Sequence, residues 1–267
     1  MSLKKIFISI CADDFGITEK VSTGILELAK KGSITATSCL VNSSDFNKVY
    51  SKIKKFKKQL DIGLHLDFTF NPTMKKNIFL NTKDEINFQF KKFEKTMGFL
   101  PDFIDGHHHI HQLPFIRNTL INIIKKKYKK NDKKPWVRIT SDEYKNIFLR
   151  NESLVKSLFL TILGNSFKKM AIKNNLKFNK RFSGIYNFKT SNYKKKFENF
   201  LLNINSGHLI MVHPGVSDKK LISLDNVTLA REKELKFLKS KQFKKILKSK
   251  NIKLIRLSKY LKSFKTN

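Results

Sequence analysis

Residues 6–16 are Ile-Phe-Ile-Ser-Ile-Cys-Ala-Asp-Asp-Phe-Gly, an apolar run that ends in two adjacent carboxylates. A short, continuous apolar run of this kind predicts a strand buried on both faces, as in a parallel sheet. Asp13 and Asp14 then fall at the point where this strand leaves the sheet. The stretch therefore indicates a buried parallel strand with a polar site at its carboxyl end.

Short apolar runs alternate with longer amphipathic stretches along the rest of the chain. Expected strands cover 6–12, 34–41, 62–68, 103–106, 136–140, 184–188, 208–213 and 252–257. Helical periodicity covers 18–31, 115–130, 193–203 and 229–249, with Gly32 placed to end the first of these helices. The alternation predicts βαβ units and an α/β fold with mostly parallel strands. Eight strands in a chain of this length favour a deformed (β/α) barrel, similar to a TIM barrel, over an open sheet.

The chain shows no internal repeat and no linker rich in Pro, Gly and Ser. We therefore expect residues 1–267 to form a single domain. Residues 142–181 form a long basic stretch with helical character. We expect this stretch to be an excursion from the barrel or a lid over it.

The composition is strongly basic, with 55 Lys and Arg against 21 Asp and Glu and a net charge of +34. Such a charge attracts nucleic acids and anionic surfaces. Only six of the 55 are Arg, the residue that binds phosphates and base edges in a bidentate manner. We therefore expect weak association with anionic membrane surfaces but no specific nucleic-acid partner.

Several features of the sequence predict a cytoplasmic location. No run reaches the roughly 18 apolar residues of a membrane span. The apolar start of the chain continues directly into Asp13 and Asp14, without the small-residue cleavage pattern of a signal peptide. Cys11 and Cys39 are too few for a disulfide scaffold, which favours a reducing compartment.

Histidines and carboxylates gather at the ends of predicted strands. They are Asp13-Asp14, His65, the run Asp-Gly-His-His-His-Ile-His at 105–111, and His213 in His-Pro-Gly. Parallel strands of a barrel all leave it on the same face. We therefore expect these residues to surround one pocket.

Each residue of this set has a chemical and an ordinary interpretation. Asp13 and Asp14 could supply one metal ligand and one general base, or else a helix cap with a solvated neighbour. His65 taken alone is more typical of a packed or surface histidine than of a metal ligand. His107 is the histidine best placed to coordinate a metal, and His109 and His111 could contact its ligands or the substrate. Asp105 could orient a ligand histidine through its other ring nitrogen.

His213 and Arg138 also allow two interpretations each. His213, at a tight strand exit before proline, suits a proton donor as well as a metal ligand. Arg138 is a charge on an apolar strand and needs a partner. That partner could be a carboxylate of the pocket or a residue of a helix outside the barrel.

Taken together and in this order, the motifs resemble those of the YdjC-like (ChbG-type) carbohydrate deacetylases, over nearly the whole chain. The matching stretches are Ala-Asp-Asp-Phe-Gly at 12–16, Ile-Thr-Ala-Thr at 34–37, Gly-Leu-His-Leu at 63–66, residues 105–111, His-Pro-Gly at 213–215 and Arg-Glu-x-Glu-Leu at 231–235. Two positions depart from the family pattern, Cys11 where Asn is common and Gly106 where Ser or Thr is common. Residues 142–181 show no family motif, and we expect substrate choice to depend on them.

The resemblance implies a deformed barrel that removes N-acetyl groups from sugars such as chitooligosaccharides with the help of a divalent cation. It implies that the metal ligands are Asp14, His65 and His107. It implies Asp13 as the catalytic base and His213 as the acid, with Arg138 as a further catalytic residue. Mg²⁺ is the favoured ion and Zn²⁺ the alternative, because one carboxylate with two imidazoles suits several ions. We also expect a homodimer.

Three alternatives remain. The same chemistry could act on a membrane-anchored N-acetylated glycolipid, with the basic tail Lys236–Lys265 holding the enzyme near the surface. His65, Asp67 and His213 could instead form the facial triad of a non-haem iron oxygenase, which usually needs an antiparallel jelly roll. The chain could also be a basic, non-catalytic protein that binds nucleic acid or an anionic surface.

Overall fold

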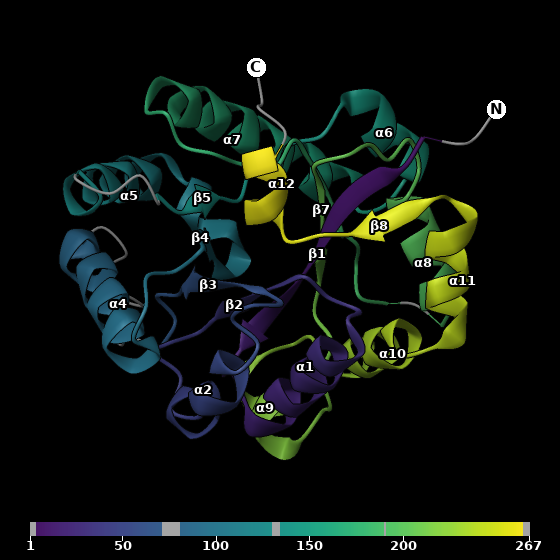
Figure 1. Cartoon of the computed structure of the whole chain (residues 1–267), viewed down its shortest axis with the longest axis horizontal. Helices are drawn as coiled ribbons and strands as arrows, with labels where there is room; N and C mark the ends of the chain where they lie inside the picture. Colours follow the sequence, from purple (N-terminus) through teal and green to yellow (C-terminus); the bar gives the residue numbers. More distant parts are fainter. Residues whose placement is uncertain (1–3, 71–80, 130–133, 190, 264–267) are drawn as a thin grey trace.

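A computed structural model describes residues 4–70, 81–129, 134–189 and 191–263 (Figure 1). Parallel strands form one sheet at its centre, in the order β5-β4-β3-β2-β1-β7-β6, with β8 paired to β1. The strands are β1 (Ile6–Phe15), β2 (Ala36–Cys39), β3 (Asp61–Leu66), β4 (Phe103–Gly106), β5 (Trp136–Val137), β6 (Arg181–Ser183), β7 (His208–Val212) and β8 (Ile252–Leu254).

Helices connect the strands, and most lie around the periphery of the sheet (Figure 1). They are α1 (Glu19–Lys31), α2 (Phe46–Lys54), α4 (Thr82–Met97), α5 (Pro114–Lys127), α6 (Tyr144–Arg150), α7 (Leu154–Lys173), α8 (Tyr193–Phe200), α9 (Lys219–Leu224), α10 (Leu229–Leu238), α11 (Lys241–Ser249) and α12 (Leu257–Ser263), with a 3₁₀ segment at His107–Gln112. Among the residues described, no helix combines the length and the apolar character needed to cross a bilayer.

The sheet curls into a deformed barrel, as predicted, and irregular hydrogen bonds bridge its two edges. The backbone N–H of Val137, in β5, donates to the carbonyl of Lys177 at 2.9 Å. The side chain of Asn179 accepts from the N–H of Ile139 at 2.8 Å and donates to the carbonyl of Ile139 at 2.7 Å. The backbone N–H of Lys180 donates to the carbonyl of Gly207 at 3.0 Å, just before β7. Residues 177–180 lead directly into β6, so these bonds connect the β5 edge with the β6 edge without a regular ladder.

Most predicted elements are present, and α1 shows why. Thr18 caps α1 by accepting from the N–H of Val21, and Gly32 ends the helix at φ 66°. The predicted helix 115–130 is observed as α5, and residue 130 lies outside the described residues. The predicted helix 229–249 is two helices, because Ser240 caps α11 by accepting from the N–H of Phe243.

The strand predicted at 184–188 is wrong, because β6 ends at Ser183. Gly184 has φ 111°, and a Cβ at this position would lie 2.2 Å from the carbonyl oxygen of Met211. Only glycine suits this turn out of the sheet. The apolar residues that follow are packed as a loop, with Tyr186 buried. Burial without strand pairing explains why their pattern resembles that of a strand.

Gly63 of β3 allows a test of how tightly the barrel is packed. A Cβ at Gly63 would lie 2.5 Å from the ring of Phe103, which stacks on Trp136. We expect Gly63→Ala to lower the free energy of unfolding by about 1–3 kcal/mol, because the rings must move. Urea denaturation measures this. Gly32→Ala is the control, since a Cβ there meets no atom within 4 Å and only the left-handed backbone costs about 1 kcal/mol. Gly63 has no left-handed backbone, so an unchanged free energy of unfolding in Gly63→Ala would show that the rings yield without cost.

Candidate active site

The end of β1 directs two neighbouring carboxylates into one pocket. On a regular strand, adjacent side chains point to opposite faces. Here the backbone of Asp14 has φ 67°, and the pairing of β1 with β2 shifts register between Ala12 and Phe15. This irregularity allows Asp13 and Asp14, both buried, to line the same cavity of about 280 Å³.

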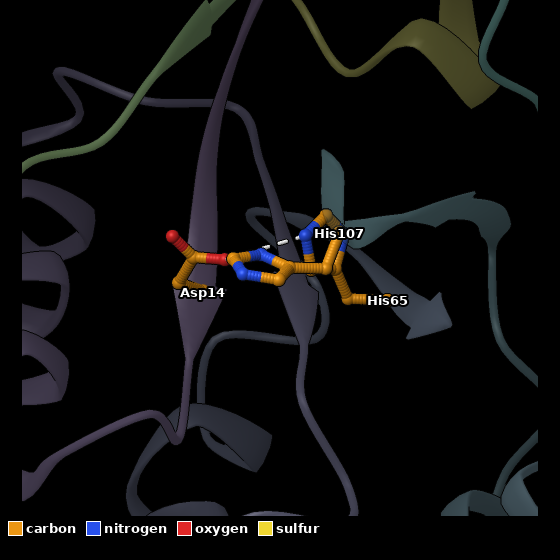
Figure 2. A group of neighbouring side chains, drawn as sticks. All are labelled: Asp14, His65 and His107. Atoms are coloured by element: carbon orange, nitrogen blue, oxygen red, sulfur yellow. Dashed lines mark hydrogen bonds and ion pairs between the residues drawn. The ribbon is translucent and has the colours of Figure 1, made fainter. Parts of the chain in front are cut away.

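Three side chains that the sequence assigns to a metal meet in this cavity (Figure 2). Oδ1 of Asp14 lies 3.0 Å from Nδ1 of His107 and 3.3 Å from Nε2 of His65. His65 comes from β3, and His107 follows β4 directly. The ligand atoms of all three residues lie within 4.8 Å of one another. The predicted convergence of the ends of β1, β3 and β4 is therefore observed.

The hydrogen bonds around this group fit a divalent cation. Nδ1 of His65 lies 2.6 Å from Oδ1 of Asp105. A proton on Nδ1 satisfies that contact, so Nε2 turns a lone pair towards Asp14. A lone pair and a carboxylate oxygen at 3.3 Å need a proton or a cation between them. One carboxylate and two imidazoles are ligands that several divalent metals accept.

The pKa values show how strongly these groups attract positive charge. Burial would lower the pKa of His65, but the carboxylates of Asp105 and Asp14 outweigh it and raise the pKa to about 10. Burial would likewise lower the pKa of His107, and Asp14 raises it. Burial would raise the pKa of Asp14, but Arg231 and His107 hold this pKa well below its ordinary value. The site therefore stabilises cationic partners of Asp14.

Arg138, directly after β5, joins carboxylates from two other strands. Its guanidinium binds Asp13 in a bidentate manner, with both N–O distances at 2.6 Å. Nη2 also forms an ion pair with Oδ2 of Asp105 at 2.6 Å. Burial would raise the pKa of Asp13, but Arg138 keeps it far below its ordinary value. Of the two sequence interpretations for Arg138, pairing with a carboxylate of the pocket is observed, and the pairing outside the barrel is wrong.

His213 directly follows β7, the strand that pairs with β1 on the side away from β2. Its side chain lines the same cavity. Its backbone N–H donates to Oε2 of Glu234 at 2.6 Å, and its ring meets Phe188 edge to face at 5.3 Å. Within the described part of the chain, Nδ1 of His213 has no hydrogen-bond partner. Burial lowers the pKa of His213 to about 4, so its ring is neutral near pH 7.

The remaining histidines of the cluster divide into two groups. His108 and His109 line the cavity, whereas Nε2 of His111 lies 3.0 Å from the carbonyl of Arg138 and supports the backbone there. The iron-oxygenase alternative is wrong on two counts. Asp67 accepts hydrogen bonds from Thr69 and joins no metal-ligand group among the residues described, and the sheet is parallel.

Sequence reasoning gave no role to three residues near α10 that support the site. Arg231 donates to Oδ2 of Asp14 at 2.6 Å and also pairs with Asp225. Glu234 accepts from the hydroxyl of Tyr186 at 2.6 Å, in addition to the N–H of His213. Arg231 and Glu234 are three residues apart and therefore share a helix face, which is fully buried. That spacing of two charges within a predicted helix is the signal that could have identified them.

Glu234 should make stability depend on pH. Burial raises the pKa of Glu234 to about 7, against about 4.3 in an unfolded chain. The stability this group contributes is fully present below pH 4 and is lost as the pH rises through 7. We expect Glu234→Gln to reduce the difference in unfolding free energy between pH 5 and pH 8 by about 3 kcal/mol. Urea unfolding at both pH values checks this, with the exposed neighbour Glu232→Gln as control. An unchanged difference would contradict it.

The chain matches the family model of YdjC-like proteins over residues 7–249. A protein of Clostridium beijerinckii named carbohydrate deacetylase is 27% identical over 253 residues, which span 86% of this chain and 90% of that protein. One of Proteus mirabilis named chitooligosaccharide deacetylase is 30% identical over 122 residues, 38% of this chain and 48% of that protein. A crystal structure from Enterococcus faecalis has a TM-score of 0.73 at 19% identity, covering 96% of this chain and 99% of that one. The chain therefore belongs to the family of YdjC-like proteins.

Proposed function

We propose that the protein is a metal-dependent hydrolase that removes the N-acetyl group from an N-acetylated amino sugar. One observation carries the proposal: Asp14, His65 and His107 share a pocket with His213 and with Asp13, which Arg138 binds from behind it. The names of the relatives, carbohydrate deacetylase and chitooligosaccharide deacetylase, indicate the class of substrate.

Asp14, His65 and His107 would hold the cation, with Mg²⁺ as the first candidate and Zn²⁺ as the second. When bound, a divalent cation supplies Lewis acidity that polarises an amide carbonyl and lowers the pKa of water. Arg231 donates a hydrogen bond to Oδ2 of Asp14, which leaves Oδ1 for the cation, and Asp105 fixes the ring of His65. These contacts orient the donor atoms and keep Asp14 ionised.

Asp13 would take the proton of the attacking water. Its carboxylate is ionised, and Arg138 fixes its orientation through two hydrogen bonds. As the C–N bond breaks, His213 would give a proton to the amine nitrogen, because an amide anion is a very poor leaving group. Because the ring of His213 is neutral near pH 7, it would first receive the proton that Asp13 takes from the water, and its low pKa makes the charged form a strong acid that passes this proton to the amine. Glu234 would position His213 through its backbone N–H.

The test is acetate release from a panel of N-acetylated oligosaccharides and glycolipids. The expected result is release that a chelator abolishes and that added Mg²⁺ or Zn²⁺ restores, which also identifies the effective ion. Absence of acetate release from the whole panel with either metal present would refute the proposal. Release that persists after exhaustive chelation, with no metal left on the protein, would refute the metal's role.

A further inference from the structure

Exposed apolar side chains gather on two segments beside the pocket. The structure describes twelve large apolar side chains as exposed. Nine of them are Tyr144, Phe148, Leu149, Val155, Phe159 and Ile162 on α6 and α7, and Ile222, Leu224 and Leu229 on α9 and α10. We call these two groups the α7 rim and the α9 rim. Isolated apolar residues are normal on a protein surface, but concentrations of this size mark a surface that binds something.

Three residues of the α7 rim lie on α7 itself, which is apolar on two sides. Val155, Phe159 and Ile162 are 84%, 56% and 60% exposed and follow the i, i+4, i+7 spacing of one helix face. The opposite side packs into the protein through Leu160 and Phe167. Figure 1 shows α7 at the outer edge of the molecule, and no described element covers the exposed face. A helix with two apolar faces is typically covered on both.

Each rim has residues that line the catalytic cavity or are adjacent in sequence to residues that do. Phe159 of the α7 rim lines the cavity, together with Lys156 of the same helix. Asp225 and Val227, which lie between Leu224 and Leu229 of the α9 rim, line the same cavity. A surface that covers the two rims therefore also covers the mouth of the pocket.

Charge decides between the candidate occupants of these rims. Lys156 and Lys219 are exposed on the same segments. The nearby acidic side chains are engaged, since Asp225 pairs with Arg231 and Asp218 caps α9. A second copy of this chain would bring two molecules of charge +34 together, which repels. An anionic bilayer instead offers negative headgroups to the lysines and an apolar interior to the rims.

We propose that the α7 and α9 rims seat the pocket mouth on an anionic lipid bilayer, and that the substrate is an N-acetylated amino sugar on a membrane-anchored lipid. The second part rests on the proposed deacetylase function. The basic tail 236–265 is less suited to this role, and its last two residues lie outside the described part. Its described residues expose lysines but no large apolar side chain, because α11 buries Phe243, Ile246 and Leu247.

The experiment measures binding of the full chain to phosphatidylcholine vesicles with about one third phosphatidylglycerol, against pure phosphatidylcholine. The rim variants are Val155→Ser/Ile162→Ser and Ile222→Ser/Leu229→Ser. Each should lower the partition coefficient about tenfold, because apolar burial in the bilayer is lost. Ile172→Ser is the matched control: Ile172 is also on α7 and 58% exposed, but it lies outside the rim face. It should bind as the unchanged chain does.

Two results would overturn the docking surface. One is a partition coefficient that is the same for the unchanged chain, both rim variants and the control. Binding would then reflect the general attraction of lysines to the anionic lipid. The other is a dimer of the unchanged chain that the rim variants dissociate, which would assign the rims to a second copy. Acetate release separates the two proposals. The ratio of activity on vesicle-borne to soluble N-acetylated sugar should fall in the rim variants. Absence of acetate release from both sugars, with rim-dependent binding intact, would refute the deacetylase proposal and retain the docking surface.

Discussion

Replacing Asp13 with asparagine is expected to lower kcat for acetate release by at least about a hundredfold while the protein still binds its metal. The amide has the shape of the carboxylate but cannot accept the proton of the attacking water. The three ligand side chains, Asp14, His65 and His107, are unchanged, and Asp105 still fixes His65. Steady-state acetate release and the metal content of the purified variant are the two measurements.

Asp13→Asn should also lower stability by about 3–5 kcal/mol, because Arg138 is fully buried and loses part of its negative charge partner. A control must therefore break a similar pair away from the pocket. Asp61 is such a residue, since it is fully buried at the start of β3 and pairs with Arg256 at 2.8 Å. Asp61→Asn should lose stability and keep kcat. If the two variants lose kcat equally, or if Asp13→Asn loses its metal, Asp13 is not the base.

The arrangement of strands could be predicted because it depends on local patterns. Each strand is a short apolar run, and parallel strands must leave a barrel on one face. That rule predicted that the strand-end residues, with Asp14, His65 and His107 among them, surround one pocket, although β1, β3 and β4 are far apart in the sequence. The family resemblance then singled out these three as the metal ligands. The rule required no knowledge of any side-chain contact, which is why it succeeded.

The end of β1 shows what local patterns miss. The strand was predicted to stop at Ala12, because the next two residues are charged, yet it continues to Phe15. The carboxylates remain in the sheet because each has a buried arginine partner. Arg138 is 125 residues from Asp13, and Arg231 is 217 residues from Asp14. The position of Arg138 on an apolar strand and of Arg231 in a helix can mark each as a buried charge. At such separations, however, no local pattern shows which carboxylate each arginine meets, so the two pairings could not be derived from the sequence.

Replacing His213 with alanine is expected to lower activity on an N-acetyl amide by about a hundred- to ten-thousandfold. The loss should depend on the leaving group. An amine needs a proton before it can leave, whereas an aryl oxide such as 4-nitrophenolate leaves without one. Hydrolysis of an aryl acetate by the same variant should therefore fall by less than about tenfold. Comparing kcat on both substrates for the unchanged chain and His213→Ala gives the measurement.

The comparison of leaving groups distinguishes an acid from a metal ligand or a merely structural residue. A lost ligand or a collapsed pocket would lower amide and ester hydrolysis together, because both need the same attacking water. Phe188→Leu supplies the matched control, since Phe188 packs against the ring of His213 but has no proton to give. Its two activities should change in parallel. A parallel loss in His213→Ala would mean that His213 shapes the pocket, and that the proton for the amine comes from elsewhere.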